Sequence, residues 1–311
     1  MSFTDEVKHE VVRYESESED EREAELTALM RKAGSIVIDK GEISFQLEFR
    51  YADLSRLIYS WLKSEYGLTV EVMVQEDHLH KRNKYEIYLP HQDRLIQLMI
   101  KLGLLSPEGQ PDFYMKEEYV RDERLGRAYL RGFFLAAGSI NHPSSQYHLE
   151  IRCDHKAQAE DLIKLLFGFQ LTPHFTEHRE NYMVYLKDFE SISAVLNLLG
   201  AEKAQLKLEN ARVVSQVKEN VNRRVNFETA NLDKTVSAAM EQIEDIDLIE
   251  SRMGLQELSD GLQEIARMRR RYPYDSLREL GERFDPPLSK SGVNSRLRRI
   301  KQIAENIRGE S

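Results

Sequence analysis

An internal repeat in the first two thirds of the chain constrains the fold more than any other feature. The segment AELTALMRKAGSI (Ala24–Ile36) aligns with AYLRGFFLAAGSI (Ala128–Ile140), and both end in Ala-Gly-Ser-Ile. Further on, NKYEIYLP (Asn83–Pro90) resembles ENYMVYLK (Glu180–Lys187) at a similar offset. Because these matches keep their order along the chain, they indicate a duplicated structural unit.

Each copy contains the same order of predicted elements. A short apolar helix runs to Gly34 or Gly138, which are suited to a left-handed helix cap. Segments with alternating apolar residues follow (EISFQLEFR and YHLEIRC), and then a helix, two more strands and a closing helix. The sequence therefore predicts an α+β pseudo-dimer of two αββαββα repeats, at about 22–105 and 126–202, within a domain of residues 22–212.

This order of elements and the segment LRGFFLAAG resemble the LAGLIDADG homing-endonuclease fold. In that family two such helices pack along a pseudo-twofold axis, a role that suits the small residues Ala33, Gly34, Ala136, Ala137 and Gly138. The family's metal-binding acid precedes the last glycine of the motif, where this chain has Ala33 and Ala137. Alanine offers no oxygen to Mg²⁺, so nothing would activate water for hydrolysis. We therefore expect no enzymatic activity, no catalytic residue and no metal or other cofactor.

The sheet surface with which homing endonucleases bind DNA is expected to be acidic in this chain. Its predicted outward residues comprise six acids and three bases, namely Glu42, Glu48, Arg50, Glu71, Lys84, Glu86, Glu150, Arg152 and Asp154. A phosphate-binding surface should be basic, because the release of counterions drives such binding. We expect this surface to bind DNA weakly at most, and either to contact a protein or to be solvated.

Three other patterns are better explained by structure than by chemistry. HFTEH (His174–His178) matches the motif of inverted zinc proteases, but the repeat places it on a strand. Its two histidines would then lie about 13 Å apart and could not share a zinc ion. SWLK (Ser60–Lys63) fits an amphipathic helix and lacks the accompanying motifs of Ser/Lys catalysis. Cys153, the single cysteine, is predicted to lie in the core.

The segments that flank the repeats are polar. Residues 1–21 are predicted to form an N-terminal helix and an acidic linker, with the acidic run Glu15–Glu25 solvated. Residues 213–254 are predicted to be a helical connector with a break in NRRVNFETAN (Asn222–Asn231). No apolar run approaches the roughly 18 residues that cross a bilayer. Because a single cysteine also fits a reducing compartment, we expect a cytoplasmic, nucleoid-associated protein without membrane contact.

Residues 255–311 form a separate domain with three predicted helices. The second helix, SLRELGERF, can be capped by Asp275 or Ser276, and the proline pair in DPPL ends it. Ser289 caps the third helix. The predicted buried positions of the three helices are Leu258, Leu262 and Ile265, then Leu277, Leu280 and Phe284, then Val293, Leu297 and Ile300. This pattern is typical of a helix-turn-helix whose last helix enters the major groove of double-stranded DNA.

The charge and polarity of the last helix suit DNA. Although the chain carries a net charge of −9, the stretch Pro286–Lys301 contains five bases and no acid. Asn294 and Arg298 are the predicted base readers, because Asn pairs with adenine and Arg with guanine, and Ser289 and Ser291 suit a phosphate at the helix start. The remaining predicted DNA contacts are Lys290, Ser295, Arg296, Arg299, Arg270 and Arg271, the four arginines to the DNA backbone.

Two further segments, LGERFDPPLSKSGVNSRLRRI and NRRVNFETANLDKTV, resemble the WhiA family of sporulation regulators, and the resemblance covers essentially the whole chain. Phe227 stands where the family's NCETAN stretch has cysteine, so no redox or metal role carries over. The resemblance implies a bacterial, sequence-specific transcriptional regulator whose C-terminal unit is similar to the promoter-reading helix-turn-helix of sigma factors. It implies control of sporulation genes in some bacteria, and of cell division or chromosome segregation in others.

The sequence is compatible with more than one role for the nuclease-like domain and with more than one biological process. The nuclease-like domain would be a scaffold or a platform for a partner, for which RNA polymerase, a sigma factor or another regulator are candidates. We expect a monomer with an internal pseudo-twofold. The alternative is a nucleoid-associated or cell-division factor whose DNA binding is not primarily transcriptional.

Overall fold

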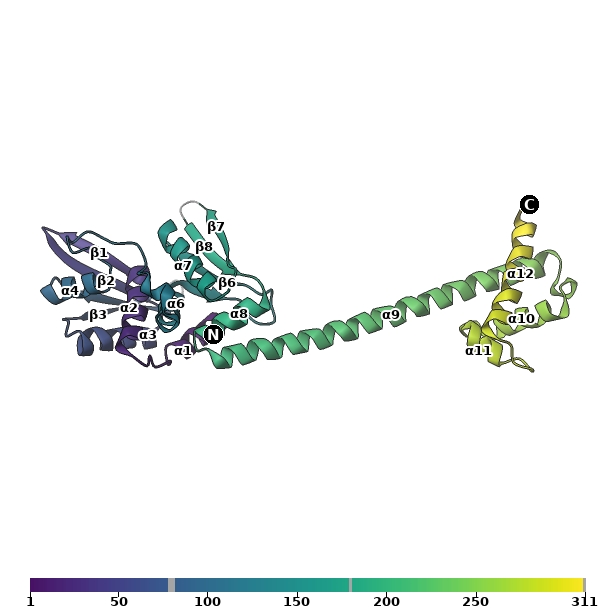
Figure 1. Ribbon diagram of the computed structural model, residues 1–311. Coiled ribbons are helices and arrows are strands. Elements are labelled where there is room, and N and C mark those ends of the chain that lie inside the picture. The colour runs from purple at the N-terminus through teal and green to yellow at the C-terminus, as the bar shows by residue number, and fades with distance from the viewer. Residues whose placement is uncertain (78–81, 179–180, 310–311) are drawn as a thin grey trace. The chain divides into compact units, whose positions relative to one another are not determined.

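The computed structural model describes residues 1–77, 82–178 and 181–309 and divides into two compact units. The first unit, here called the body, is Met1–Ser215, and the second, the C-terminal unit, is Gln216–Ser311. The body contains all of the strands described here, and the C-terminal unit is helical (Figure 1). In the described part of the chain, no helix combines the length and the apolar character needed to cross a membrane.

The body consists of two equivalent halves. The first half contains α2 (Glu19–Ala33), β1 (Gly34–Asp39), β2 (Glu42–Phe49), α3 (Ala52–Ser60) with a π-helical turn (Trp61–Glu65), β3 (Glu71–Asp77), β4 (Arg82–Leu89) and α4 (Asp93–Lys101). The second half contains α6 (Glu123–Ala137), β5 (Gly138–Ile140), β6 (Leu149–Cys153), α7 (Lys156–Gly168), β7 (His174–His178), β8 (Asn181–Leu186) and α8 (Phe189–Leu198). A short helix, α5 (Glu118–Arg121), precedes α6.

The two antiparallel sheets have the same strand order, β1-β2-β4-β3 and β5-β6-β8-β7. The predicted α+β fold with two αββαββα repeats is therefore confirmed. Strand β7 includes the HFTEH segment, as predicted, and Cys153 is only 3% exposed. Burial raises the pKa of the Cys153 thiol to about 12, which fits the predicted core role and not a reactive thiolate.

Helices α2 and α6 lie side by side between the two sheets (Figure 1). Their backbones approach closely at Gly132, where a Cβ atom would lie 2.2 Å from the carbonyl oxygen of Glu25 and 3.0 Å from Cβ of Ala28. Sequence analysis did not single out Ala28 or Gly132. The small residues that it did single out lie at the ends of the two helices, where Ala33 and Ala137 are half-buried.

The prediction of left-handed helix caps was wrong. Gly34 and Gly138 have φ angles of −103° and −76°, so each helix passes directly into a strand. Neither position has room for a side chain. A Cβ atom at Gly34 would lie 2.1 Å from the ring of Phe45, and one at Gly138 would lie 2.2 Å from the ring of Phe134.

The N-terminal segment belongs to the core of the body. Helix α1 (Phe3–Val11) buries Phe3, Val7 and Val11. The prediction of a solvated acidic linker was wrong from Glu19 onwards, because α2 begins there and buries Glu21 and Glu25. The Glu25 carboxylate accepts a hydrogen bond of 2.8 Å from Nε of Arg131 on α6, which gives this buried acid a partner across the helix pair.

Helix α9 (Glu202–Arg252) contributes residues to both units. The predicted break in Asn222–Asn231 is absent, and the helix is continuous. The segment contains neither glycine nor proline, and an ion pair of 3.0 Å between Arg224 and Glu228 supports the helix at this point. The polar composition of this segment was therefore not a sign of a break in the helix.

The C-terminal unit contains the rest of α9, a 3₁₀ turn (Leu255–Glu257), α10 (Asp260–Arg271), α11 (Leu277–Glu282) and α12 (Lys290–Gly309). Each of these elements contributes to one apolar core. Its buried residues are Ile246 and Ile249 from α9, and Leu255, Leu258, Leu262, Ile265, Ala266, Leu280, Phe284, Val293, Leu297, Ile300 and Ala304.

Candidate nucleic-acid interface

The connection between α11 and α12 is a tight helix-turn-helix. The hydroxyl of Ser276 accepts a hydrogen bond from the backbone N–H of Glu279, whose carboxylate accepts one in return from the Ser276 N–H. At the other end of α11, the N–H of Leu288 donates to the carbonyl of Gly281 at 3.0 Å. A Cβ atom at Gly281 would lie 2.3 Å from the carbonyl oxygen of Leu288, so only glycine allows this approach. The turn therefore holds the start of α12 against α11.

Helix α12 has one apolar face and one exposed polar face. The hydroxyl of Ser289 accepts a hydrogen bond of 3.1 Å from the N–H of Gly292, which confirms the predicted cap. The predicted stripe of Val293, Leu297 and Ile300 is buried in the core. On the opposite face the exposed residues Ser291, Ser295 and Arg298 follow one another at helical spacing, with Arg299 beside them, and Asn294 is half-buried at the edge of that face.

Three cations of α12 are free to bind an external anion. Lys290, Arg298 and Arg299 are exposed, and none of them has a hydrogen bond or an ion pair within the described residues. Charged side chains that have no internal partner can neutralise phosphates without first breaking a contact. This face of α12, with Ser289, Ser291, Asn294 and Ser295, is called the α12 face below.

Two of the arginines predicted to contact DNA are already bound within the unit. Arg296 donates to the carbonyl of Gly261 at 3.3 Å and lies 3.6 Å from the carboxylate of Glu264. Arg270 pairs with Asp247 and Glu250. Their contacts brace α12 against α10 and α10 against α9, which revises the expectation for both. Arg271 is exposed and lies over the ring of Tyr272 at 5.6 Å.

Arg269 has a structural role that sequence analysis missed. It is 1% exposed and donates to the carbonyl of Asp275 at 2.7 Å, which holds the connection between α10 and α11. Burial lowers the pKa of its guanidinium. The helical spacing of Leu262, Ala266 and Arg269 could have indicated that this arginine lies on the buried face and not among the phosphate-binding bases.

The two positions at which the LAGLIDADG family carries its metal-binding acid lie at a cavity in the body. Ala33 and Ala137, at the ends of α2 and α6, line a cavity of about 570 Å³. Its lining contains four bases, Lys8, Lys32, Arg50 and Arg152, and two acids, Asp5 and Glu48. The Glu48 carboxylate pairs with Lys84 at 2.6 Å, and that of Asp5 accepts a hydrogen bond of 2.9 Å from the Tyr51 hydroxyl.

These residues do not fit the divalent cation of a homing endonuclease. Such a cation requires several oxygen ligands, whereas the cavity carries more basic than acidic side chains. Among the described residues, no group of three or more His, Cys, Asp or Glu side chains is placed to hold a metal ion.

Comparisons with known proteins assign the whole chain to one family. Three family models match in succession: the WhiA N-terminal LAGLIDADG-like domain over residues 19–105, the WhiA LAGLIDADG-like domain over 126–218, and the WhiA C-terminal HTH domain over 221–304. The chain belongs to the WhiA family. The resemblance inferred from the sequence is thereby confirmed.

Individual relatives match over their full lengths. The chain is 50% identical to a protein of Halothermothrix orenii over 100% of both chains, and 40% identical to one of Clostridium beijerinckii over 99% of both. Both relatives are named "Probable cell division protein WhiA". A crystal structure of full-length DUF199/WhiA from Thermatoga maritima is 27% identical and covers 98% of this chain and 99% of its own, with a TM-score of 0.60.

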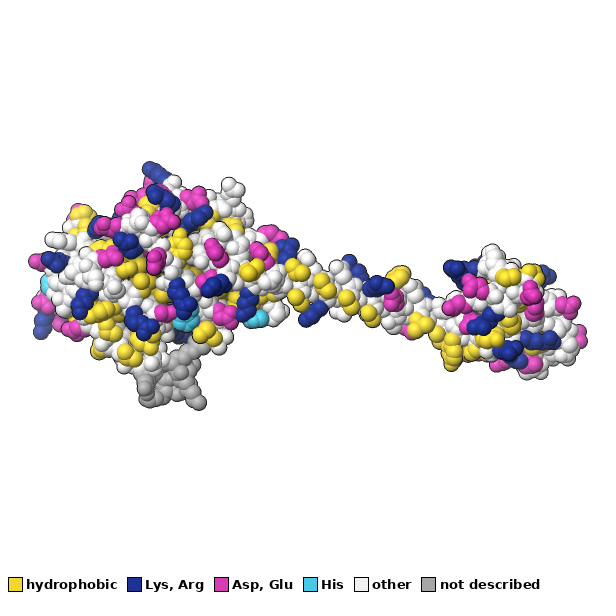
Figure 2. Space-filling view, turned by 90° about the horizontal axis from the view of Figure 1, so that it is seen from below, with side chains coloured by type: hydrophobic (Ala, Val, Ile, Leu, Met, Phe, Trp, Pro, Cys, Tyr) yellow, Lys and Arg dark blue, Asp and Glu magenta, His cyan; other side chains and the backbone are white. Residues whose placement is uncertain are grey.

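The outer sheet surface of the body is not basic. Glu48 on β2 lies directly opposite Glu86 on β4, and Glu42 on β2 and Glu71 on β3 are exposed. The expectation that Glu86 is exposed was wrong, because β4 is an inner strand and its neighbours leave Glu86 only 8% exposed. On the face of the body drawn in Figure 2, basic and acidic side chains are interspersed and form no continuous basic patch.

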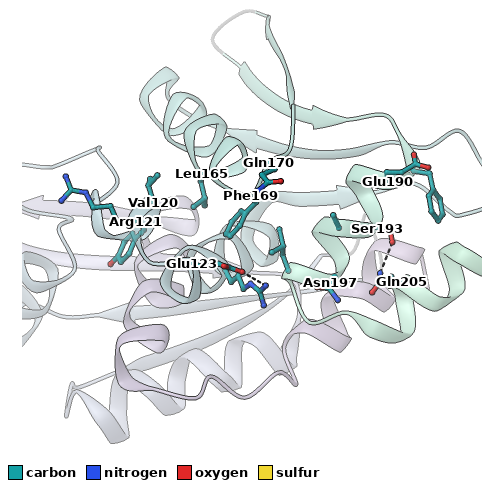
Figure 3. A pocket seen from close by; sticks show the side chains of 16 residues that line it. Val120, Arg121, Glu123, Leu165, Phe169, Gln170, Glu190, Ser193, Asn197 and Gln205 are labelled. Carbon is teal, nitrogen blue, oxygen red and sulfur yellow. Dashed lines mark hydrogen bonds and ion pairs between the residues drawn. The ribbon is translucent and has the colours of Figure 1, made fainter.

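The largest cavity among those described in the WhiA body, of about 810 Å³, lies beside α5, α6, α7 and α8 (Figure 3). Four of its polar residues bind one another: Glu123 pairs with Arg127 at 2.7 Å, and the Gln205 amide donates to the Ser193 hydroxyl at 3.0 Å. Arg121 pairs with Glu117 outside the cavity. These paired groups would have to break a contact before they could orient a ligand.

Proposed function

We propose that this WhiA-family protein is a non-enzymatic regulator that binds double-stranded DNA through the α12 face. The observation that carries the proposal is the free and exposed set Lys290, Arg298 and Arg299 on a helix whose opposite face is locked into a helix-turn-helix core. The match to the family's C-terminal HTH domain supports it. Such a helix presents its N-terminal half to the major groove.

The residues of the α12 face divide into two roles in this proposal. Arg298 and Asn294, one helical turn apart, read base edges, because their side chains can form paired hydrogen bonds with guanine and adenine. Lys290 and Arg299 bind phosphates, together with the hydroxyls of Ser289 and Ser291 at the helix start. Ser295, between the base readers, lines the same face, and Arg271 adds a backbone contact.

Binding of the full-length protein to a duplex containing its site tests this assignment. Arg298→Ala should weaken binding to that site by about tenfold to a hundredfold, in keeping with about 1–3 kcal/mol for a paired contact to a base. Arg278→Ala is the matched control, since Arg278 is an exposed arginine of α11 that pairs with Glu282. Equal effects of the two substitutions would contradict the assignment of Arg298 as a base reader.

Two biological processes are candidates for this DNA binding. Transcriptional control, of sporulation genes or of other promoters, is the primary proposal, with RNA polymerase, a sigma factor or another regulator as the partner of the body. The second candidate is a cell-division or nucleoid factor in which DNA binding is not primarily transcriptional, and it is favoured by the name that the relatives carry.

A strain carrying Asn294→Ala/Arg298→Ala distinguishes the two processes. Loss of promoter occupancy together with altered transcript levels supports transcriptional control. Unchanged transcripts together with a division defect support the second candidate.

Nuclease activity is not part of the proposal, since Ala33 and Ala137 replace the acids that hold the metal in homing endonucleases. Supercoiled plasmid incubated with the protein and Mg²⁺ or Mn²⁺ should stay intact. Nicking that depends on metal and stops with a chelator would contradict this.

A further inference from the structure

The cavity between the ends of α2 and α6 is built by both halves of the body and by α1. Helix α1 contributes Lys8, the first half contributes Arg50 and Leu54, and the second half contributes Ala136 and Ala137. At about 570 Å³, the cavity is in the size range of small-molecule sites, roughly 300–1,000 Å³.

Two of the four cations that line this cavity, Lys8 and Arg50, are not engaged in an ion pair within the described residues. Three ion pairs join Lys32 with Asp154 at 2.5 Å, Arg152 with Glu150 at 3.2 Å, and Glu48 with Lys84 at 2.6 Å. The remaining acid of the lining, Asp5, lies one helical turn before Lys8 on α1 and attracts its ammonium group. Within the described residues, neither Lys8 nor Arg50 makes a hydrogen bond or an ion pair. The ammonium group of Lys8 instead lies over the rings of Tyr51, at 5.4 Å, and Phe134, at 5.9 Å.

Lys8 is a costly residue for the fold to keep. It is only 6% exposed, Asp5 attracts it and Arg50 repels it, and the attraction does not offset the cost of burial, which lowers its pKa. A buried cation without an ion-pair partner destabilises a protein, because the transfer from water is not compensated. An anion that enters the cavity would neutralise the charge of Lys8. This lysine would then have a role in ligand binding that packing alone does not explain.

We propose that this cavity binds a small phosphorylated anion, with Lys8 and Arg50 as the phosphate contacts. An ammonium group and a planar guanidinium provide charge-assisted hydrogen bonds to several phosphate oxygens at once. The side chains of Leu54, Ala136 and Ala137 form an apolar wall for the uncharged part of the ligand. A free phosphorylated molecule fits better than a nucleic-acid backbone, because Lys8 is only 6% exposed and a small anion can reach it more readily than a wide duplex.

Calorimetric titration of the full-length protein with inorganic pyrophosphate at pH 7 tests the proposal. The wild-type protein should bind, and Arg50→Gln should weaken binding by about tenfold, as expected for one lost charge-assisted contact. Arg56→Gln is the matched control, because Arg56 is an exposed arginine on the neighbouring helix α3 outside the cavity. It should change the affinity by less than about twofold. No binding at millimolar pyrophosphate, or equal losses in the two variants, would overturn the proposal.

Lys8→Met provides a second test, since it removes the charge and keeps an apolar side chain of similar length. This variant should also lose pyrophosphate binding. Because removal of the buried charge should not destabilise the fold, the loss of binding could not be attributed to unfolding. Tight binding by Lys8→Met would exclude Lys8 as a phosphate contact and overturn the proposed site.

Competition distinguishes the two sources of phosphate. The variant Asn294→Ala/Arg298→Ala, impaired in the proposed helix-turn-helix binding, is loaded with pyrophosphate and mixed with duplex DNA. Retention of pyrophosphate supports a free small molecule as the ligand, and its displacement supports a backbone phosphate at the same site. Arg50→Gln should leave site-specific DNA binding through α12 intact, so failure of this proposal and failure of the proposed function are separable.

Discussion

At the scale of single residues, Lys8 makes stability depend on pH. Burial lowers the pKa of its ammonium group from 10.5 to about 8, a shift that Arg50 increases and Asp5 opposes. Between these values the unfolded chain binds a proton that the folded chain has lost, so this lysine's contribution to stability rises with pH. The charged and aromatic groups around it are Asp5, Arg50 and Tyr51, with Lys32, Glu48 and Arg152 lining the same cavity.

Lys8→Met should therefore increase the free energy of unfolding at pH 7 by about 1–3 kcal/mol. Urea unfolding of the wild type and the variant, at several pH values from 7 to about 9.5, measures this. The difference between the two proteins should shrink as the pH rises through 8, because the wild-type lysine is then neutral when folded. A variant that is less stable than the wild type at pH 7 would contradict this account of Lys8.

The buried pair of Glu25 and Arg131 is a second residue-scale determinant. Burial raises the pKa of the Glu25 carboxyl, and the charge of Arg131 and its hydrogen bond oppose that rise. Arg131→Met leaves the acid without its cation and should cost about 3–5 kcal/mol in thermal or urea unfolding. The double variant Glu25→Leu/Arg131→Met should lose less than Arg131→Met alone. A double variant that is less stable than both single variants would show that the ion pair itself stabilises the helix contact.

At the scale of elements, the crossing of α2 and α6 depends on Gly132. Gly132→Ala should destabilise the body by about 1–3 kcal/mol, because the added methyl group would lie 2.2 Å from a backbone carbonyl oxygen that cannot move alone. Gly168→Ala is the matched control, since its Cβ would have no neighbour closer than 4.0 Å at the end of helix α7. The control should be neutral or slightly stabilising. Equal losses for the two variants, measured by thermal unfolding, would contradict a close approach at Gly132.

The elements also show what could be predicted from the sequence. Periodicity identified the buried stripe and the exposed face of α12, because both depend on neighbours within one helix. It did not identify the close approach of Gly132 to Glu25, because these residues are far apart in the sequence and only the folded body brings them together. The ion pairs of Arg270 and Arg296 were not predicted either, because their partners lie on other helices. The cavity around Lys8 was not predicted, because the N-terminal helix was expected to lie outside the repeats.

At the scale of the whole molecule, we propose that the C-terminal unit binds DNA and that the body has a different task. The free cations of the α12 face contrast with the mixed charges of the body's outer sheet surface, where Glu48 and Glu71 are exposed. A polyanion should therefore bind the first and avoid the second. The phosphate-binding cavity proposed for the body is a local exception that suits a small anion.

The most direct test of this division is a salt titration of DNA binding by three full-length proteins. These are the wild type, Asn294→Ala/Arg298→Ala, and the charge reversal Glu48→Lys/Glu71→Lys. We expect a steep fall of wild-type affinity with salt, loss of the site-specific part of the affinity in the first variant, and unchanged or increased affinity in the second. If the first variant binds like the wild type and the second loses affinity, the body binds the DNA and the central claim is contradicted.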